Sequence, residues 1–168
     1  VDVLVVGAGN AALCAALAAA EQGASVLVLE RAPESARGGN SAYTGGAFRV
    51  AYDGAEDISR LVSDLSPSEL AHSDIEMSAM RADADLVEVL VNRSFETLQW
   101  MRSQGVRFIP IHGRQSFLVD GKHKFWGGLT IEVSGGGADL VDSLFTRAQR
   151  QGVRIAYDHK MTELLVED

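Results

Sequence analysis

The first thirty residues alternate between two strand-like stretches and one helix-like stretch. Val1 to Val6 are apolar apart from Asp2, Ala11 to Ala20 form a run of small apolar residues, and Ser25 to Glu30 repeats the strand-like pattern. Turns containing glycine separate these stretches, as is typical of a change from one element to the next. The order strand, helix, strand predicts a βαβ unit.

Helical spacing returns in two later segments. Between Ala55 and Gln104 apolar residues recur at helical intervals and predict two or three helices, and Ala138 to Gln151 predicts another, which Gly152 ends. We expect the apolar residues of the longer segment to lie in the core; they are Leu86, Leu90, Phe95, Leu98, Trp100 and Met101.

Short strand-like pieces fill the remaining segments. They span 106–109, 116–119, 129–131, 153–157 and 161–166. The first three, with turn formers at Asp120–Gly121 and Gly127–Gly128, predict a small antiparallel patch. The last two follow the final helix and restore the α/β alternation.

Together these elements predict an α/β fold, a Rossmann-like domain with a parallel central sheet ordered 153–157, 25–30, 1–6. We expect one domain over 1–168, in which 1–50 and 134–168 form the core and 51–133 is a helical and small β excursion. The chain starts within a strand pattern and has no initial Met, so we expect a piece of a longer protein and a truncated domain.

Composition and charge narrow the class of protein. With 46% hydrophobic and 23% charged residues and a mean hydropathy of +0.04, the chain is that of an ordinary globular domain. A net charge of -8 argues against a nucleic-acid partner. The single cysteine, Cys14, forms no internal disulfide or metal framework and fits a reducing cytoplasm, so we expect no metal and a cytoplasmic location.

The turn after the first strand carries Gly7, Gly9 and Ala12 in a G-x-G-x-x-A pattern. Gly7 permits a tight turn, and Gly9 lets the backbone approach a pyrophosphate, whose charge the start of a helix favours. Glu30 ends the second strand 21 residues after Gly9, near the offset of about 20 at which an acid binds ribose hydroxyls. These features predict a dinucleotide site; the alternative is a turn that merely packs tightly.

A second glycine cluster, Arg37 to Ser41 and then Thr44 to Gly46, follows within 16 residues of Glu30. Its backbone amides would meet phosphate, and a flavin ring would lie where side chains are absent. The pattern favours FAD over a nicotinamide cofactor, with a flexible surface loop as the alternative.

These motifs, with Lys124 to Thr130 and Gly135 to Val141, resemble the N-terminal part of the fumarate reductase/succinate dehydrogenase flavoprotein superfamily, and within it the FAD-dependent tricarballylate dehydrogenases. The similarity runs over essentially the whole chain, although members are more than twice as long, with a capping domain that would lie beyond Asp168. The flavoprotein portion of precorrin-3B synthases, a related family, leaves a second substrate class open.

The resemblance implies a set of residues for non-covalent FAD, since no histidine for covalent attachment occurs between Arg37 and Phe48. The implied set is Gly7, Ala8, Gly9, Asn10 and Ala11 at the pyrophosphate, Glu30 and Arg31 at the ribose, Gly38, Gly39, Asn40 and Ser41 near the phosphates and flavin edge, Thr44, Gly45 and Gly46 along the flavin ring, and the backbone of Met161 at adenine.

The resemblance also implies a reaction, the removal of two hydrogens from adjacent carbons of a small polycarboxylate, as in tricarballylate going to cis-aconitate. An electron acceptor, a protein or a membrane-associated partner, would complete the cycle. No residue is assigned as catalytic acid or base. A piece that is not catalytic and associates with itself is the remaining alternative.

Basic residues gather in the excursion, at Arg107, His112, Arg114, Lys122, His123 and Lys124. They are able to steer a polycarboxylate, although surface turns also collect such residues. His72 and His159 have no ligand spacing to a partner, and we expect both to be exposed.

Overall fold

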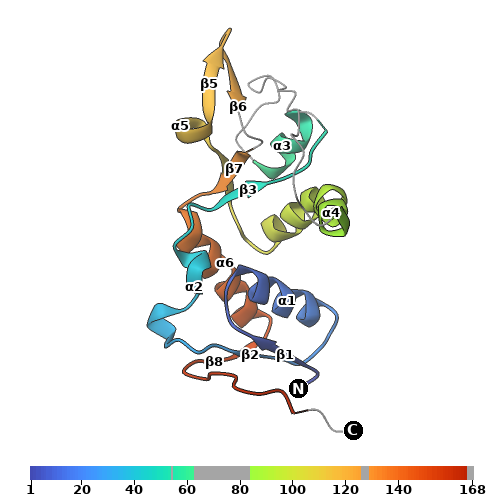
Figure 1. Cartoon of the computed structure of the whole chain (residues 1–168), viewed down its shortest axis with the longest axis vertical. Coiled ribbons are helices and arrows are strands. Elements are labelled where there is room, and N and C mark those ends of the chain that lie inside the picture. The colour runs from blue at the N-terminus through green and yellow to red at the C-terminus, as the bar shows by residue number, and fades with distance from the viewer. Residues whose placement is uncertain (54, 63–83, 126–128, 166–168) are drawn as a thin grey trace. The chain divides into compact units, whose positions relative to one another are not determined.

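Two units make up the chain in its computed structural model, which describes residues 1–53, 55–62, 84–125 and 129–165. The first unit comprises 1–44 and 135–168, and the second comprises 45–134 (Figure 1). Residues 45–50, which the sequence analysis groups with the core, therefore fall in the second unit. The reason is a long-range strand pairing that local patterns do not show.

The elements of the first unit, in chain order, are β1 (Val3–Val6), α1 (Asn10–Glu21), β2 (Val26–Leu29), the 3-10 helix η1 (Glu34–Ala36), α2 (Gly39–Ala42), α6 (Gly136–Arg150) and β8 (Arg154–Ala156). Those of the second unit are β3 (Ala47–Arg49), α3 (Ala55–Leu61), α4 (Ala84–Ser103), β4 (Phe108–Pro110), α5 (His112–Gln115), β5 (Ser116–Val119), β6 (Lys122–Phe125) and β7 (Leu129–Val133).

A parallel three-stranded sheet in the order β1-β2-β8 is the centre of the first unit, which confirms the α/β fold and the strand order predicted from the sequence. Helices α1 and α6 pack on each other, and Figure 1 shows them on the same side of the sheet. Their facing side chains form the core; fully buried members include Leu13, Leu17, Leu140, Leu144 and Phe145. The small alanine side chains along α1 allow this helix to lie close to its neighbouring elements, because they fill little space between them.

The predicted strand over 161–166 is wrong for the residues that the structure describes. Residues 161–165 have no strand conformation, and Leu164 and Leu165 are 77% and 82% exposed. A strand needs a hydrogen-bonded neighbour, and none of the described strands pairs with this segment. Residue 166 lies outside the described residues.

Two antiparallel sheets, rather than the single predicted patch, form in the second unit. One is the hairpin β5–β6, whose turn residues Asp120 and Gly121 have φ of 52° and 75°, as the turn pattern predicts. The other has the order β3-β7-β4 and draws its edge strand β3 from residues before the predicted excursion. The turn predicted at Gly127–Gly128 and the residue His72 lie outside the described residues.

Helices α3 and α4 pack together in the second unit. The C-terminal half of α4 buries Leu98 and Met101, as expected, whereas Leu86 and Leu90 are 68% and 50% exposed, so their expected core role is wrong. Apolar residues recur at helical spacing along the whole helix, but only its C-terminal part is buried. At that end the chain turns back, and the Val106 N–H donates to Met101 O. No helix among the described residues has the length and apolar character to cross a bilayer.

Candidate dinucleotide site

The glycine turn between β1 and α1 is tightly closed. Gly7 has φ of 90°, a left-handed conformation that side chains disfavour, and its N–H donates to Leu29 O at 2.7 Å. The turn is thereby hydrogen-bonded to the end of β2, the strand that Glu30 directly follows. The spacing of Gly7 and Glu30 in the sequence predicts that the turn and the end of β2 lie close together, as the structure shows.

Glu30 directs a buried carboxylate at that turn. Glu30 is only 7% exposed. Its Oε2 accepts the Ala8 N–H at 2.8 Å, and its Oε1 accepts the Ala32 N–H at 2.8 Å. Two backbone donors compensate the burial of the charge. The contribution of Ala32 has no signal in the sequence, because a backbone N–H carries no residue preference.

The start of α1 carries no side chain at its N-cap position. Gly9 occupies the N-cap position and provides no side-chain cap, and the Asn10 N–H donates to Ser41 Oγ at 3.0 Å. A Cβ on Gly9 would lie 3.3 Å from Ser41 Oγ, so the loop containing Ser41 lies directly against the helix start. The unpaired amides at a helix start and the helix dipole both favour phosphate.

The first part of the loop carrying Gly38 to Ser41 is packed against α6. Gly38 is buried with φ of 94°, and a Cβ there would lie 3.0 Å from Val141 Cγ2 on α6. Gly39, with φ of 52°, begins the short helix α2 that ends just after Ser41. The alternative of a flexible surface loop is therefore wrong for Gly38.

The third glycine cluster, at the start of α6, serves packing. Gly137 N–H donates to Thr44 O at 2.9 Å, and a Cβ on Gly137 would overlap Ser41 O. The carboxylate of Asp139, in the first turn of α6, occupies the position that a Cβ on Gly135 would take. This helix start is filled by the protein itself.

The remaining predicted residues lie in several places. Arg31 and Asn40 are exposed in the first unit, whereas Gly45 and Gly46 belong to the second unit, where Gly46 O accepts the Val133 N–H at 2.9 Å. Met161 is exposed in the segment without strand structure. The structure thus brings together the glycine turn, Glu30 and the loop from Gly38 to Ser41, all within the first unit.

The segment after β8 runs beside the end of β2. Asp158 N–H donates to Ala32 O at 3.2 Å and His159 N–H donates to Glu30 O at 2.9 Å. His159 is exposed, as expected. This segment, which Met161 follows, borders the side of the site where Glu30 lies.

Cys14 and the histidines His112 and His123 lie in surroundings that show no catalytic arrangement. Burial raises the pKa of Cys14 to about 11, which keeps the thiol neutral and unreactive near neutral pH. His123 on β6 has Nδ1 3.1 Å from Ser116 Oγ, and its ring centroid is 4.2 Å from that of His112, all in the second unit. The described residues hold no cluster of three or more side chains able to ligate a metal ion.

The residues of the first unit fit the adenosine diphosphate half of FAD. Gly9 leaves the start of α1 free of a side chain, Glu30 presents a buried carboxylate beside the turn, and Ser41 adds a hydroxyl. Backbone amides and a helix start suit a pyrophosphate, and a carboxylate suits ribose hydroxyls.

Comparisons of the sequence with known proteins agree with this chemistry. Residues 2–168 match the family model described as FAD binding domain. The chain is 30% identical to a probable fumarate reductase, Ifc3, of Shewanella frigidimarina over 99% of the chain and 27% of that protein. It is 33% identical to vinyl phenol reductase of Lactiplantibacillus plantarum over 92% of the chain and 29% of that protein. The chain therefore spans less than a third of these relatives.

Solved structures share the fold. The 3-ketosteroid-Δ4-(5α)-dehydrogenase of Rhodococcus jostii RHA1 superposes with a TM-score of 0.60 and 25% identity over 94% of this chain and 37% of that one. An open conformation of a flavocytochrome c3 fumarate reductase superposes with a TM-score of 0.62 and 24% identity over 98% of this chain and 28% of that one.

Proposed function

The chain belongs to the FAD binding domain family, within the fumarate reductase/succinate dehydrogenase flavoprotein superfamily. We propose that it is the cofactor-binding part of an oxidoreductase that adds or removes two hydrogens at adjacent carbon atoms. FAD, the cofactor of this family, supplies two-electron redox chemistry at its flavin ring. The observation that carries the proposal is the buried Glu30 carboxylate, directed at the glycine turn where α1 begins.

The residues of the first unit have distinct roles in this proposal. Glu30 accepts hydrogen bonds from the ribose, and the pyrophosphate lies at the turn formed by Gly7, Ala8, Gly9, Asn10 and Ala11. Within that turn, the Ala8 N–H donates to Glu30 and the Asn10 N–H donates to Ser41. Ser41 places its hydroxyl at the same helix start. FAD is held without a covalent bond. The further contacts proposed from the resemblance are Arg31, Gly38, Gly39, Asn40, Thr44, Gly45, Gly46 and the Met161 backbone.

The proposed substrate is a small polycarboxylate of the tricarballylate type, which loses two hydrogens to become an alkene, with a separate electron acceptor. The relatives support the class of reaction, since their names are those of reductases of fumarate and of vinyl phenol. Basic side chains on β6, at Lys122, His123 and Lys124, supply charge that suits carboxylates.

Cofactor binding is tested by titrating FAD into the full-length apoprotein and following flavin fluorescence. We expect Glu30→Gln to lower the affinity for FAD by about tenfold, the scale of one lost charge-assisted hydrogen bond. Glu88→Gln, on the exposed face of α4, is the matched control and should bind FAD like the wild type. A wild type that binds no FAD, or a Glu30→Gln variant with unchanged affinity, contradicts the proposed function.

The substrate class is tested separately with the FAD-loaded protein. Under anaerobic conditions, tricarballylate should bleach the flavin absorbance, whereas a 3-ketosteroid, precorrin-3A and 4-ethylphenol should leave it unchanged. Bleaching by one of these other compounds and not by tricarballylate would keep the FAD site and replace the substrate.

A further inference from the structure

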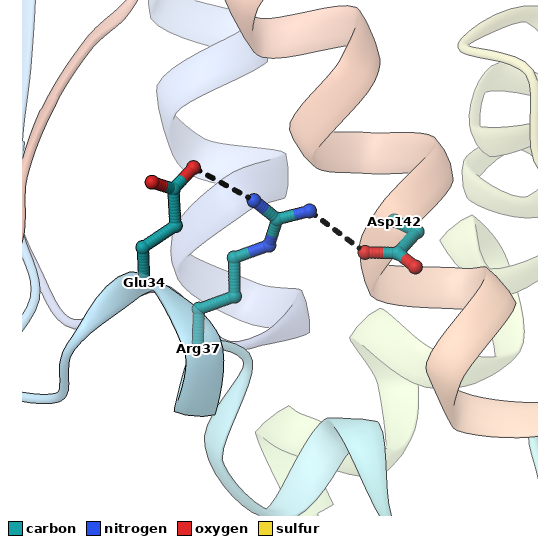
Figure 2. Close-up of polar contacts among 3 residues, drawn as sticks. All are labelled: Glu34, Arg37 and Asp142. Atoms are coloured by element: carbon teal, nitrogen blue, oxygen red, sulfur yellow. Dashed lines mark hydrogen bonds and ion pairs between the residues drawn. The ribbon is translucent and has the colours of Figure 1, made fainter.

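Arg37 lies at the centre of a contact that joins the loop of the FAD site to α6 (Figure 2). Its Nη2 is 2.9 Å from Asp142 Oδ1 on α6, and its Nη1 is 3.3 Å from Glu34 Oε1 on η1. The guanidinium carbon also lies 4.4 Å from the centre of the Phe145 ring, a cation–π distance. The side chain is 26% exposed, so these contacts hold it against the protein surface.

The charge of Arg37 is engaged by the protein. Two carboxylates face one guanidinium, so the group of Glu34, Arg37 and Asp142 carries a net negative charge (Figure 2). The hydrogen bond to Asp142 raises the pKa of Arg37, which is charged at any physiological pH. A pyrophosphate placed on this group would meet the two carboxylates, and repulsion from them opposes direct binding.

Arg37 directly precedes the residues that cover the start of α1. Gly38 follows it in a left-handed conformation and packs against Val141 of α6. Ser41, four residues after Arg37, accepts the Asn10 N–H at 3.0 Å. Arg37 and Gly38 thus fasten to α6 the segment that delivers Ser41 to the helix start.

We propose that Arg37, held by Asp142 and stacked on Phe145, is a positioning residue that sets the Gly38–Ser41 segment over the pyrophosphate end of the FAD site. This inference rests on the proposed function, because it assumes that FAD binds there. A planar guanidinium is required, since it pairs with two carboxylates and stacks on a ring at the same time. A lysine ammonium keeps the charge but cannot reproduce that geometry.

The competing explanation is a direct contact between Arg37 and phosphate. The two explanations predict opposite changes in FAD affinity for the variant Asp142→Asn. Asp142→Asn removes one of the two negative charges beside the guanidinium, so it would strengthen FAD binding if Arg37 contacted phosphate. In a positioning role, the same variant loosens the segment and weakens binding. Asp142→Asn is also a mild change at a side chain that is 63% exposed, so it should fold even where an arginine variant does not.

The experiment compares Arg37→Lys, Arg37→Met, Asp142→Asn and the double variant Arg37→Met/Asp142→Asn in the full-length protein. Arg93→Met is the matched control, because Arg93 and Glu96 form an exposed ion pair, 3.0 Å apart, on α4 of the second unit. FAD affinity is measured by fluorescence titration. Hydrogen–deuterium exchange of the first turn of α1 is measured in the apoprotein, and the melting temperature reports any general loss of stability.

We expect Arg37→Lys, Arg37→Met and Asp142→Asn each to weaken FAD binding by about tenfold, the scale of one charge-assisted hydrogen bond. The double variant should bind FAD no more weakly than Arg37→Met, because the loss of Arg37 already removes the contact that Asp142→Asn disrupts. Exchange at the first turn of α1 should rise in these variants, while Arg93→Met changes neither readout.

Tighter FAD binding by Asp142→Asn, or full rescue by Arg37→Lys, overturns the inference in favour of a phosphate contact. Lower melting temperatures with unchanged FAD affinity and unchanged exchange reduce Arg37 to a structural role. A wild type that binds FAD while all the variants bind equally well overturns this inference alone, whereas a wild type that binds no FAD overturns the proposed function as well.

Discussion

The two long helices of the first unit both begin after glycines, yet their starting turns are used in opposite ways. At α1, Gly9 leaves the helix start without a side-chain cap, and the Asn10 N–H donates to the Ser41 hydroxyl. At α6, Gly137 is in contact with the backbone of Ser41 and Thr44, and the carboxylate of Asp139 lies over the first turn. A glycine at a helix start therefore indicates either access or close packing, and its neighbours decide which.

The largest test of this comparison is Gly137→Ala. The added Cβ would overlap Ser41 O and lie 2.8 Å from Thr44 O, and backbone atoms cannot move aside as a flexible side chain can. We expect a loss of about 3 kcal/mol or more in the free energy of unfolding. Urea denaturation measures it, with Gly113→Ala as the control, because a Cβ there meets nothing within 4 Å. An unchanged midpoint for Gly137→Ala would remove the packing role from α6.

Gly9→Ala should separate binding from stability. Its Cβ would lie 3.3 Å from Ser41 Oγ, the movable end of a side chain, so we expect the urea midpoint to change little. The methyl group would stand where a pyrophosphate approaches, and we expect FAD affinity to fall by about tenfold, or 1.4 kcal/mol. Fluorescence titration measures the affinity. Wild-type affinity in this variant would break the distinction between the two helix starts.

Asp139→Asn should affect the start of α6 alone. The carboxylate stabilises the positive end of its own helix, and its loss should cost about 0.3 to 1 kcal/mol of unfolding free energy at low salt. FAD affinity should not change, because the proposed phosphate site is at the start of α1. If the variant bound FAD more weakly while keeping its stability, the anion site would have to be reassigned to α6.

Cys14 lies one turn into α1, and burial raises the pKa of its thiol to about 11. A thiol whose pKa rises on folding stabilises the fold below its unfolded value of 9.0 and loses that contribution as pH climbs toward 11. At pH 9 the loss should be about 0.4 kcal/mol.

Urea denaturation at pH 7 and pH 9 checks this last expectation, with Cys14→Ala as the reference for all other titrating groups. Between pH 7 and pH 9 the wild type should lose about 0.4 kcal/mol of unfolding free energy relative to Cys14→Ala. Equal pH dependence in both would mean that the thiol is as accessible in the folded protein as in the unfolded chain.

Local patterns predict most of the first unit. Apolar runs locate β1, α1 and β2, and the glycine turn with Glu30 at the end of β2 locates the centre of the candidate site. These predictions succeed because hydrophobic alternation, turn formers and helix ends act over a few residues. The pairing of β1 with β2 also follows from the short connection through α1, whereas β8 pairs with β2 although the whole second unit lies between them in the chain.

Contacts between distant residues escape such patterns. Strand β3 pairs with β7 across about eighty residues of chain, which moves 45–50 into the second unit. Arg37 and Asp142 are separated by 105 residues, and no spacing rule relates them. The packing of Gly137 against Ser41 depends on two helices meeting, so the sequence reveals a glycine there but not its purpose.

The dependence of the Gly38–Ser41 segment on α6 also bears on the order in which the protein is made. A ribosome completes Ser41 long before it reaches Asp142 and Phe145, the side chains that anchor Arg37. A segment of a nascent chain packs only after its partner has emerged from the ribosome. The Gly38–Ser41 segment therefore has no helix to pack against until α6 has left the exit tunnel.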